Sequence, residues 1–352
     1  MKGAMKALRL HKTTQKIVDG LKLETVPIPE IGPRDVLIDI KATGLCGSDI
    51  HFIDGSSILP KFPTILGHET AGIICEVGSE VKDYKVGDRV CANFATPCGK
   101  CYQCLTGRPS ICPNRSMIGV TDDGAYAEYV KTASSALIRL PDNIPFDQGA
   151  AATDAVATPF HMISKRSGMK PGDTVAVFGL GGLGIHAVEI ARMYGAGMII
   201  GVDVDDYICE RAKKLFGADE VINSRKIDAV AEIKRITGDG VDISLEVVGV
   251  PESQLQAVNC LRPGGRALMG GLGAAPVAMP NTGIFVRREW EVLGCYAFEN
   301  LEIEKVLKLA SAGRLDLSKT VTSHIKLEDI SVGLQDLHQK KGYPIRIVAV
   351  QD

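Results

Sequence analysis

The segment from about residue 173 to residue 296 alternates apolar runs with helix-length stretches, and this alternation constrains the fold more than any other feature. Such a rhythm is typical of a parallel sheet covered by helices. We expect helices over 182–194, 206–216, 227–236 and 252–261. The expected strands are 174–178, 198–203, 220–222, 241–247, 266–271 and 291–296. Six strands make a complete dinucleotide-binding sheet, so this part is predicted to be a doubly wound α/β domain.

A glycine-rich turn follows the first of these strands and opens the first helix. Its residues are Gly179, Leu180, Gly181, Gly182, Leu183 and Gly184, which have the G-x-G-x-x-G spacing. The spacing alone is a weak signal, but its place between a strand and a helix raises its value. The first glycine allows a tight turn, the second lets backbone N–H groups approach a pyrophosphate, and the third allows close packing of helix on sheet.

A carboxylate, Asp203, ends the second strand of the series. At that place it can accept hydrogen bonds from both ribose hydroxyls of NAD, and it would repel the additional phosphate of NADP. The next residues, 204–206, supply no Arg or Lys to hold that phosphate. The sequence therefore predicts NAD as the cofactor. The alternative is an α/β domain that binds no nucleotide.

Residues 1 to about 155 have a different pattern, in which short apolar runs such as 36–40 alternate with Gly, Pro and Asp turns. This pattern is typical of a β-rich fold. A chain of 352 residues is long for one compact core, which also favours two domains. The tail, 298–352, carries one expected helix at 301–312 and one expected strand at 345–350.

Four cysteines lie on one short segment, at Cys98, Cys101, Cys104 and Cys112. Four thiolates are the full ligand set of a tetrahedral zinc site, and with no open position such a zinc would be structural. The alternative is two disulfides or four unrelated thiols. No export signal precedes the cysteines, and closely spaced cysteines without one favour a metal over disulfides.

Together these motifs resemble the zinc-containing medium-chain alcohol dehydrogenases, over essentially the whole chain. The resemblance implies a GroES-like, β-rich catalytic domain and a Rossmann NAD-binding domain with a six-stranded parallel sheet. The catalytic domain would span 1–155 and be completed by 298–352, which packs back on it, and the NAD-binding domain would span 156–297. The resemblance also implies two Zn²⁺ ions per chain, one catalytic and one structural.

The resemblance places the catalytic zinc ligands at three separate segments. The Cys of Gly-Leu-Cys46-Gly-Ser and the His of Gly67-His68-Glu69 match two ligands of the family. The third is often Cys; here the matching residue is Asp154, an acceptable zinc ligand that some microbial members also use. Glu69 matches the family's alternate carboxylate ligand.

Further roles carry over by the same resemblance. Ser48 would take the proton of the reacting hydroxyl, and His51 would pass it to solvent, which suits a group that titrates near neutral pH. For His51 the alternative is a surface histidine in a turn. Asp49 matches the carboxylate that orients the ligand His68. The remaining matches are Thr158 and Val247 beside the nicotinamide, Arg346 on the cofactor pyrophosphate, and Phe94 as an aromatic wall of the substrate pocket.

The predicted function is reversible hydride transfer between an alcohol, favoured to be secondary or cyclic, and NAD. Polyol, threonine or hydroxyacyl-CoA substrates remain alternatives within the family. A zinc-free quinone reductase-like enzyme would lack the ligands at 46, 68 and 154, and a non-catalytic member would lack Ser48 or His51. Both alternatives are therefore disfavoured.

Charge and hydropathy exclude other classes of partner. The net charge is −2, and the sequence has no basic arm of the kind that binds nucleic acid. No apolar run is long enough to span a bilayer, and no signal-peptide core follows the N-terminus, so we expect a cytoplasmic protein. The last sheet strand carries Val292, Leu293 and Tyr296 on an edge. An apolar edge invites pairing with a second chain, and by resemblance we expect a homotetramer built from such dimers.

Overall fold

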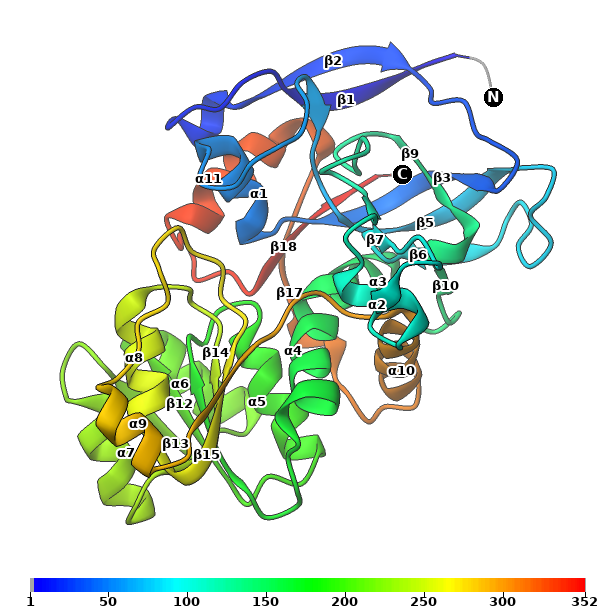
Figure 1. Ribbon diagram of the computed structural model, residues 1–352. Helices are drawn as coiled ribbons and strands as arrows, with labels where there is room; N and C mark the ends of the chain where they lie inside the picture. Colours follow the sequence, from blue (N-terminus) through cyan, green and yellow to red (C-terminus); the bar gives the residue numbers. More distant parts are fainter. Residues whose placement is uncertain (1–2, 352) are drawn as a thin grey trace. The chain divides into compact units, whose positions relative to one another are not determined.

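The computed structural model describes residues 3–351, which form two compact units. Unit 1 comprises residues up to Ala157 together with those from Ala297 onward, and unit 2 comprises Thr158–Tyr296. Figure 1 labels most of their helices and strands. Among the described residues, no helix is both long and apolar enough to span a membrane.

Unit 1 is β-rich and holds three sheets. The largest has strand order β10-β6-β5-β3-β18-β17, with β9 pairing β3. Its strands are β3 (Asp35–Gly44), β5 (Glu69–Val77), β6 (Arg89–Ala92), β9 (Tyr129–Ala133), β10 (Leu137–Arg139), β17 (Val321–Ile325) and β18 (Arg346–Val350). The second sheet contains β1 (Ala4–Leu10), β2 (Leu21–Pro27) and β4 (Thr64–Ile65), and the third pairs β7 (Ala95–Thr96) with β8 (Ser116–Met117).

The helices of unit 1 lie between and beside these strands (Figure 1). They are α1 (Gly47–Asp54), α2 (Tyr102–Leu105), α3 (Phe146–Ala151), α10 (Asn300–Ser311) and α11 (Ile330–His338). The chain leaves α3 through a π-helical turn, η4 (Ala152–Val156), and continues into α4 (Ala157–His161). Leu10, Leu45 and Ile53 are fully buried in one core that α11 also packs against through Ile330 and Leu334.

Unit 2 is a doubly wound α/β fold, as the sequence predicted. Its six strands are all parallel, in the order β13-β12-β11-β14-β15-β16. They are β11 (Thr174–Phe178), β12 (Met198–Asp203), β13 (Glu220–Asn223), β14 (Val241–Glu246), β15 (Leu261–Met269) and β16 (Glu291–Gly294). The strand order reverses between β11 and β14, and a doubly wound sheet binds its ligand at this switch point.

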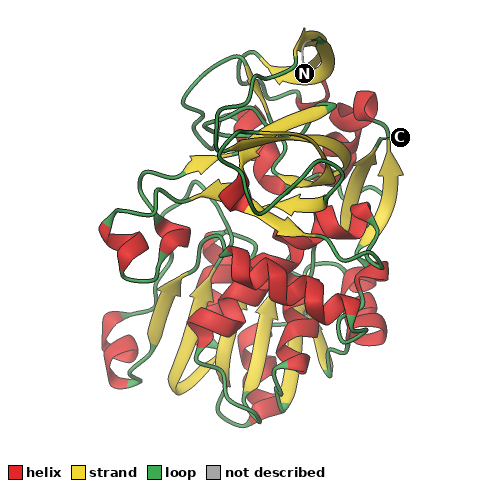
Figure 2. Ribbon diagram, turned by 90° about the vertical axis from the view of Figure 1, so that its right-hand side faces the viewer, coloured by secondary structure: helices red, strands yellow, loops and turns green. Residues whose placement is uncertain are grey.

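Helices of unit 2 run along this sheet, as Figure 2 shows by the bands of red ribbon beside the yellow strands. They are η5 (Met162–Ser167), α5 (Gly184–Met193), α6 (Asp206–Phe216), α7 (Ala229–Thr237), α8 (Pro251–Asn259) and α9 (Thr282–Arg287). Aspartates at the N-caps of α6 and α7, Asp205 and Asp228, accept hydrogen bonds from backbone N–H groups of the first turn. This is why both helices begin close to the predicted positions.

Three expectations about elements need correction. Helix α5 begins at Gly184 rather than 182, because the glycines before it form the turn. Helix α8 ends at Asn259, and β15 begins at Leu261 and carries Pro263 and two glycines through a shift in register. The tail holds more than one helix and one strand, since β17 and α11 also belong to it.

Candidate active site

Four side chains in unit 1 bring possible metal ligands within reach of one ion. They are Cys46, His68, Glu69 and Asp154, whose ligand atoms lie within 4.8 Å of one another. Cys46 caps the N-terminus of α1, Glu69 begins β5, and His68 directly precedes that strand. Asp154 lies in the π-helical turn η4, an irregularity that is frequent at functional sites.

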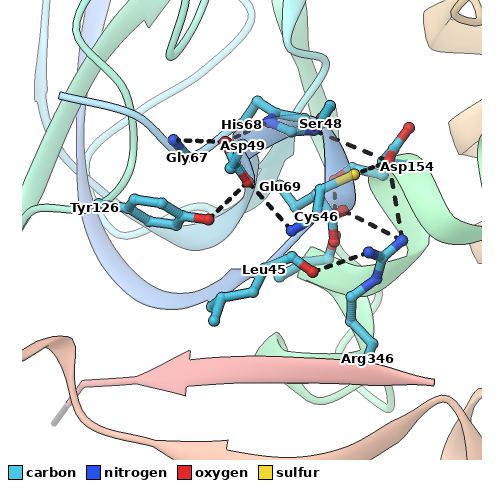
Figure 3. Close-up of polar contacts among 12 residues, drawn as sticks. Leu45, Cys46, Ser48, Asp49, Gly67, His68, Glu69, Tyr126, Asp154 and Arg346 are labelled. Atoms are coloured by element: carbon cyan, nitrogen blue, oxygen red, sulfur yellow. Dashed lines mark hydrogen bonds and ion pairs between the residues drawn. The ribbon is translucent and has the colours of Figure 1, made fainter. Parts of the chain in front are cut away.

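The spacing of these atoms fits a tetrahedral divalent cation. The Cys46 Sγ atom lies 3.3 Å from the Asp154 Oδ2 atom, and His68 Nε2 lies 3.9 Å from that same oxygen. Zinc bonds of about 2.0–2.3 Å at tetrahedral angles put ligand atoms about 3.3–3.8 Å apart. In Figure 3 the three side chains point toward one another. A thiol, an imidazole and a carboxylate together suit zinc.

Glu69 is a buried carboxylate without a hydrogen bond. Its side chain is fully buried, and neither oxygen has a hydrogen-bond partner within residues 3–351. Its closest counter-charge is Arg346, 3.4 Å away, which also lies 3.9 Å from Asp154 and donates to the backbone oxygen of Leu45. A Cβ at Gly44 would overlap the Glu69 carboxylate, so any other residue there would have to displace it. Unpaired buried oxygens are costly and are normally satisfied by a partner such as a metal ion.

The acidic groups of this set interact strongly. Burial raises the pKa of Glu69 to about 8, and burial together with the Asp154 charge raises the pKa of Cys46. For His68, burial opposes protonation, but the carboxylates of Asp49 and Asp154 hold its pKa well above the usual value. Several acidic groups lie close together in this buried place, and the negative charge of each raises the pKa of the others. A divalent cation supplies the positive charge that allows them to ionise.

Asp49 and Tyr126 fix the orientation of His68. The Asp49 carboxylate lies 3.3 Å from His68 Nδ1 and accepts hydrogen bonds from the Tyr126 hydroxyl at 2.7 Å and from the Cys46 backbone N–H at 3.2 Å (Figure 3). This contact leaves His68 Nε2 facing the other ligands. Sequence reasoning identified Asp49 but missed Tyr126, which is fully buried. Gly67 lies so close to Tyr126 that a Cβ there would overlap the ring. This glycine beside His68 is the sequence feature that could have indicated the close packing.

The two candidate proton-transfer residues lie on one helix. The Ser48 Oγ atom is 3.4 Å from His68 Nε2, on the side of the ring that faces the ligand set. His51 lies one turn further along α1, and its Nδ1 atom is 3.0 Å from the Ser56 hydroxyl. Residues three apart share a helix face, so Ser48 and His51 lie on the same side of α1. Their roles stay predictions.

An aromatic row leads away from the ligand set. The Phe94 ring packs edge-to-face on the His68 imidazole, with centroids 5.7 Å apart, and Phe298 packs in the same way on Phe94 at 5.5 Å. Phe94 is half-buried, and Phe298 is buried. Sequence reasoning named Phe94 and missed Phe298.

The four cysteines of the second candidate metal set also converge. The Cys101 sulfur lies 3.5 Å from that of Cys104 and 3.7 Å from that of Cys112, and all ten cysteines of the chain are free thiols. These separations are far too long for disulfides and close to the roughly 3.8 Å expected between sulfurs around one zinc ion. The backbone N–H of Lys100 is the largest contribution lowering the pKa of Cys98 to about 6.

The glycine-rich turn of unit 2 has a backbone that explains two of its glycines. Gly179 has φ +88°, a conformation that other residues rarely adopt, and a Cβ at Gly184 would overlap the Gly179 carbonyl oxygen. At Gly181 a Cβ would meet no atom of the chain within 4 Å. The fold itself therefore does not require glycine at 181, which fits a position kept small for a ligand.

Asp203 holds this turn from the end of β12. One carboxylate oxygen accepts a hydrogen bond from the Leu180 N–H at 2.8 Å, and the other accepts from the Val204 N–H at 2.7 Å. Each oxygen keeps a second lone pair for a hydroxyl group. The ligand role of Asp203 stays a prediction, and sequence reasoning missed this link to the turn. Lys226, in the segment after β13, pairs with Asp206.

Glu246 is a residue of unit 2 that sequence reasoning missed. It ends β14 and is fully buried. Its Oε1 atom accepts hydrogen bonds from the N–H groups of Val248 and Gly249 and from the Ser253 hydroxyl, at 2.7–2.9 Å. The available signal was a carboxylate at the carboxyl end of an expected strand, the edge at which a doubly wound sheet binds its ligand. Val247 and Val248 follow it and lie beside Gly179 and Gly184 of the turn. The contact of Val247 with the nicotinamide stays a prediction.

The remaining predicted contacts fall in different units. Thr158 belongs to unit 2, in α4, and Arg346 belongs to unit 1, beside the carboxylates of the metal set. The predicted contacts of Thr158 with the nicotinamide and of Arg346 with the pyrophosphate stay predictions.

Comparison with known proteins adds independent information. Residues 32–142 match the family model described as the alcohol dehydrogenase GroES-like domain, and residues 182–312 match that of the zinc-binding dehydrogenases. The chain is 34% identical to the sorbitol dehydrogenase of Bacillus subtilis (strain 168), over 98% of this chain and 96% of that protein. It is 31% identical to the D-xylulose reductase A of Aspergillus niger, over 95% of each.

A solved structure agrees with the fold of the whole chain. The 2R,3R-butanediol dehydrogenase from Bacillus subtilis is 30% identical and superimposes with a TM-score of 0.88, over 99% of this chain and 100% of that one. All three relatives are named as enzymes that act on a carbinol group or on its carbonyl product.

Proposed function

Because the chain belongs to the zinc-containing medium-chain alcohol dehydrogenases, we propose that it oxidises a secondary or cyclic alcohol to the ketone with NAD, and catalyses the reverse reaction. The overall change is R₂CH–OH plus NAD⁺ to R₂C=O, NADH and a proton. The observation that carries the proposal is the convergence of Cys46, His68 and Asp154, with the Ser48 hydroxyl 3.4 Å from His68.

Each part of the site has a distinct task. Cys46, His68 and Asp154 would hold a catalytic zinc, with Glu69 as an alternate ligand, and that zinc supplies Lewis acidity that lowers the pKa of a hydroxyl group. The Ser48 Oγ atom would accept the substrate proton, and His51 would pass it toward solvent. The cysteine lobe would hold a second, structural zinc, giving two per chain.

The preference for NAD over NADP rests on Asp203. Its carboxylate is only 7% exposed and lies at the glycine-rich turn, where a ribose phosphate would meet a negative charge. Replacing Asp203 with Asn removes that charge and keeps one acceptor oxygen for the turn. We expect the NAD-to-NADP ratio of kcat/KM to fall by about tenfold, since a lost charge contact changes binding by about 1.4 kcal/mol. Asp206→Asn is the control, and an equal ratio in both variants would remove Asp203 from the ribose site.

The assembly proposed is a homotetramer in the cytoplasm. Strand β16 is the last strand of its sheet and pairs only with β15 among the described strands, so its other edge is available for a second chain. Light scattering on the purified protein measures the mass directly. A mass of one chain would contradict the proposal.

The first test is NAD reduction by protein with a measured zinc content. The panel contains primary, secondary, cyclic and polyhydric alcohols and a hydroxyacyl-CoA. Turnover of at least one secondary or cyclic alcohol with about two zinc ions per chain is the result expected. No turnover of any alcohol by protein that carries both ions would overturn the proposal. The sorbitol dehydrogenase and xylulose reductase relatives make polyols the second candidate class.

A further inference from the structure

We propose that the groove between helices α7 and α8 of unit 2 binds an aliphatic carboxylate, with the carboxylate at Lys234 and the chain along Val230 and Leu255. The proposed reaction uses neither helix. The site is therefore a second binding site, and its test does not depend on the proposed function.

The groove is formed by two regular helices. Helices α7 and α8 pack beside each other on unit 2 (Figure 1), and the groove between them has a volume of about 730 Å³. Small-molecule sites in proteins have volumes of about 300–1,000 Å³. Residues 230 and 234 of α7 and residues 252, 255, 256 and 259 of α8 line it, which is the spacing of one face on each helix.

The apolar part of the groove is aliphatic. Ile227, Val230 and Leu255 line it; Ile227 is 48% exposed and Leu255 is 36% exposed. None of the described residues that line the groove is aromatic. A nucleotide base or another flat ring would find no ring to stack on, whereas an alkyl chain gains from covering branched aliphatic side chains.

The carboxylates that line the groove already have partners in their own helices. Asp228 accepts hydrogen bonds from the N–H groups at the start of α7, and the Gln256 amide donates to Glu252 at 3.5 Å. Lys226, a lining cation, pairs with Asp206. The remaining lining cations are Arg225, which is exposed, and Lys234, which is half-buried.

Lys234 is the cation that most needs an anion. Within residues 3–351 it makes no ion pair, although it is half-buried, and a partly desolvated charge gains more from a partner than an exposed one. Burial raises the pKa of the Cys260 thiol and the Lys234 charge opposes that rise, so the ammonium group lies near the end of α8. Asn259, a half-buried amide at that end, also lines the groove and can donate to a carboxylate.

The test is calorimetric titration of the purified, zinc-loaded protein with decanoate. We expect one site per chain with a Kd of about 0.1–1 mM, the range for a ligand of this size with one ionic contact. Acetate lacks the chain and decyltrimethylammonium reverses the charge, so both should bind at least about tenfold more weakly. Absence of saturable decanoate binding, or equal binding of the cationic analogue, would overturn the proposal.

Variants place the ligand in the groove. Lys234→Gln should weaken decanoate binding by about tenfold, since it removes the ionic contact. Leu255→Glu puts a charge on the apolar wall and should weaken binding at least as much. Because Leu255 is partly exposed, the variant should fold normally, which the midpoint of thermal unfolding checks.

Matched controls lie outside the groove. Arg235→Gln removes the next cation of α7, which pairs with Glu232, and Leu301→Glu changes an exposed leucine of α10. Both should bind decanoate as the original protein does, and losses equal to those in the groove variants would overturn the proposal. Cys46→Ser checks the mixed metal set, where a carboxylate could also bind. Unchanged affinity is expected there, and loss of binding in that variant alone would place decanoate at the metal.

Discussion

The two candidate metal sets of unit 1 are built in opposite ways. The cysteine lobe takes all four ligands from Cys98 to Cys112, a single short segment. The mixed set takes its ligands from α1, β5 and the turn η4, which lie far apart in the sequence. The lobe offers four thiols, whereas the mixed set has the Ser48 hydroxyl, a second carboxylate and the Phe94 ring beside it.

From this difference we expect a structural role for the cysteine lobe and a catalytic role for the mixed set. A short segment can close around an ion without the rest of the fold, so its metal contributes to folding and leaves no position open. A set assembled from distant segments exists only after the sheet has formed. Its metal can therefore be held at a place where other groups converge, which a reaction requires. Substitutions in each set separate the two roles.

The largest effect is expected for Cys46→Ser. The serine hydroxyl is a poor zinc ligand because it does not ionise near neutral pH, and turnover should fall by about 1,000-fold or more. The protein should retain one zinc ion per chain, in the lobe. Steady-state kinetics and metal analysis measure both. The matched control is Cys75→Ser, a half-buried thiol outside both sets, which should keep both ions. Loss of both ions in Cys46→Ser would show that the two sets are not independent.

The opposite result is expected for Cys104→Ser in the lobe. Without a complete ligand set the zinc of the lobe should be lost, and the midpoint of thermal unfolding should fall by several degrees. The fraction that stays folded should keep a kcat within about threefold of the original, since the lobe holds no reacting group. A normal midpoint with a strongly reduced kcat would contradict the structural role.

A smaller effect is expected at the residues behind His68. Asp49→Asn keeps the shape but weakens the contact with His68 Nδ1, which lies 3.3 Å away. Outer carboxylates of this kind change metal affinity by about 10–100-fold. Chelator titration should show that loss for the mixed set alone. Tyr126→Phe, which removes a 2.7 Å hydrogen bond to Asp49, should give a weaker change in the same direction. Equal weakening of the lobe zinc would indicate general loosening of unit 1.

The same contrast explains what the sequence could and could not predict. The lobe and the glycine-rich turn are contiguous, and strands such as Thr174–Phe178 have apolar runs bounded by turns, so local patterns sufficed. Tyr126, Phe298 and Glu246 act through contacts with residues far away in the chain, and no spacing rule reports such contacts. The ligand set at 46, 68 and 154 became readable only through resemblance to a family.

Two expectations about elements were wrong for reasons that the structure shows: the start of β15 and the number of helices in the tail. Pro263 and the two glycines after it look like a break, but β15 absorbs them where its register with β14 shifts. The Trp290 indole donates to the Arg262 carbonyl and stabilises this irregular start. The missed helix α11 did have a signal, since Leu327, Ile330 and Leu334 recur at helical spacing and are buried.

The smallest effect tests whether the glycine-rich turn, a contiguous motif, also depends on Glu246, which is distant in the sequence. Glu246 holds Val248 and Gly249 by their N–H groups, and Val248 lies against Gly179 of the glycine-rich turn. Glu246→Gln keeps one acceptor oxygen but removes the charge and adds a buried N–H₂ group where Oε2 has no partner among the described residues. Because this loosens the edge that faces the nucleotide, we expect KM for NAD to rise about fivefold with kcat nearly unchanged. Glu252→Gln, on an exposed carboxylate of the neighbouring helix α8, is the control. A lower unfolding midpoint with an unchanged KM for NAD would limit Glu246 to a role in folding, and the glycine-rich turn would then be as self-contained as the cysteine lobe.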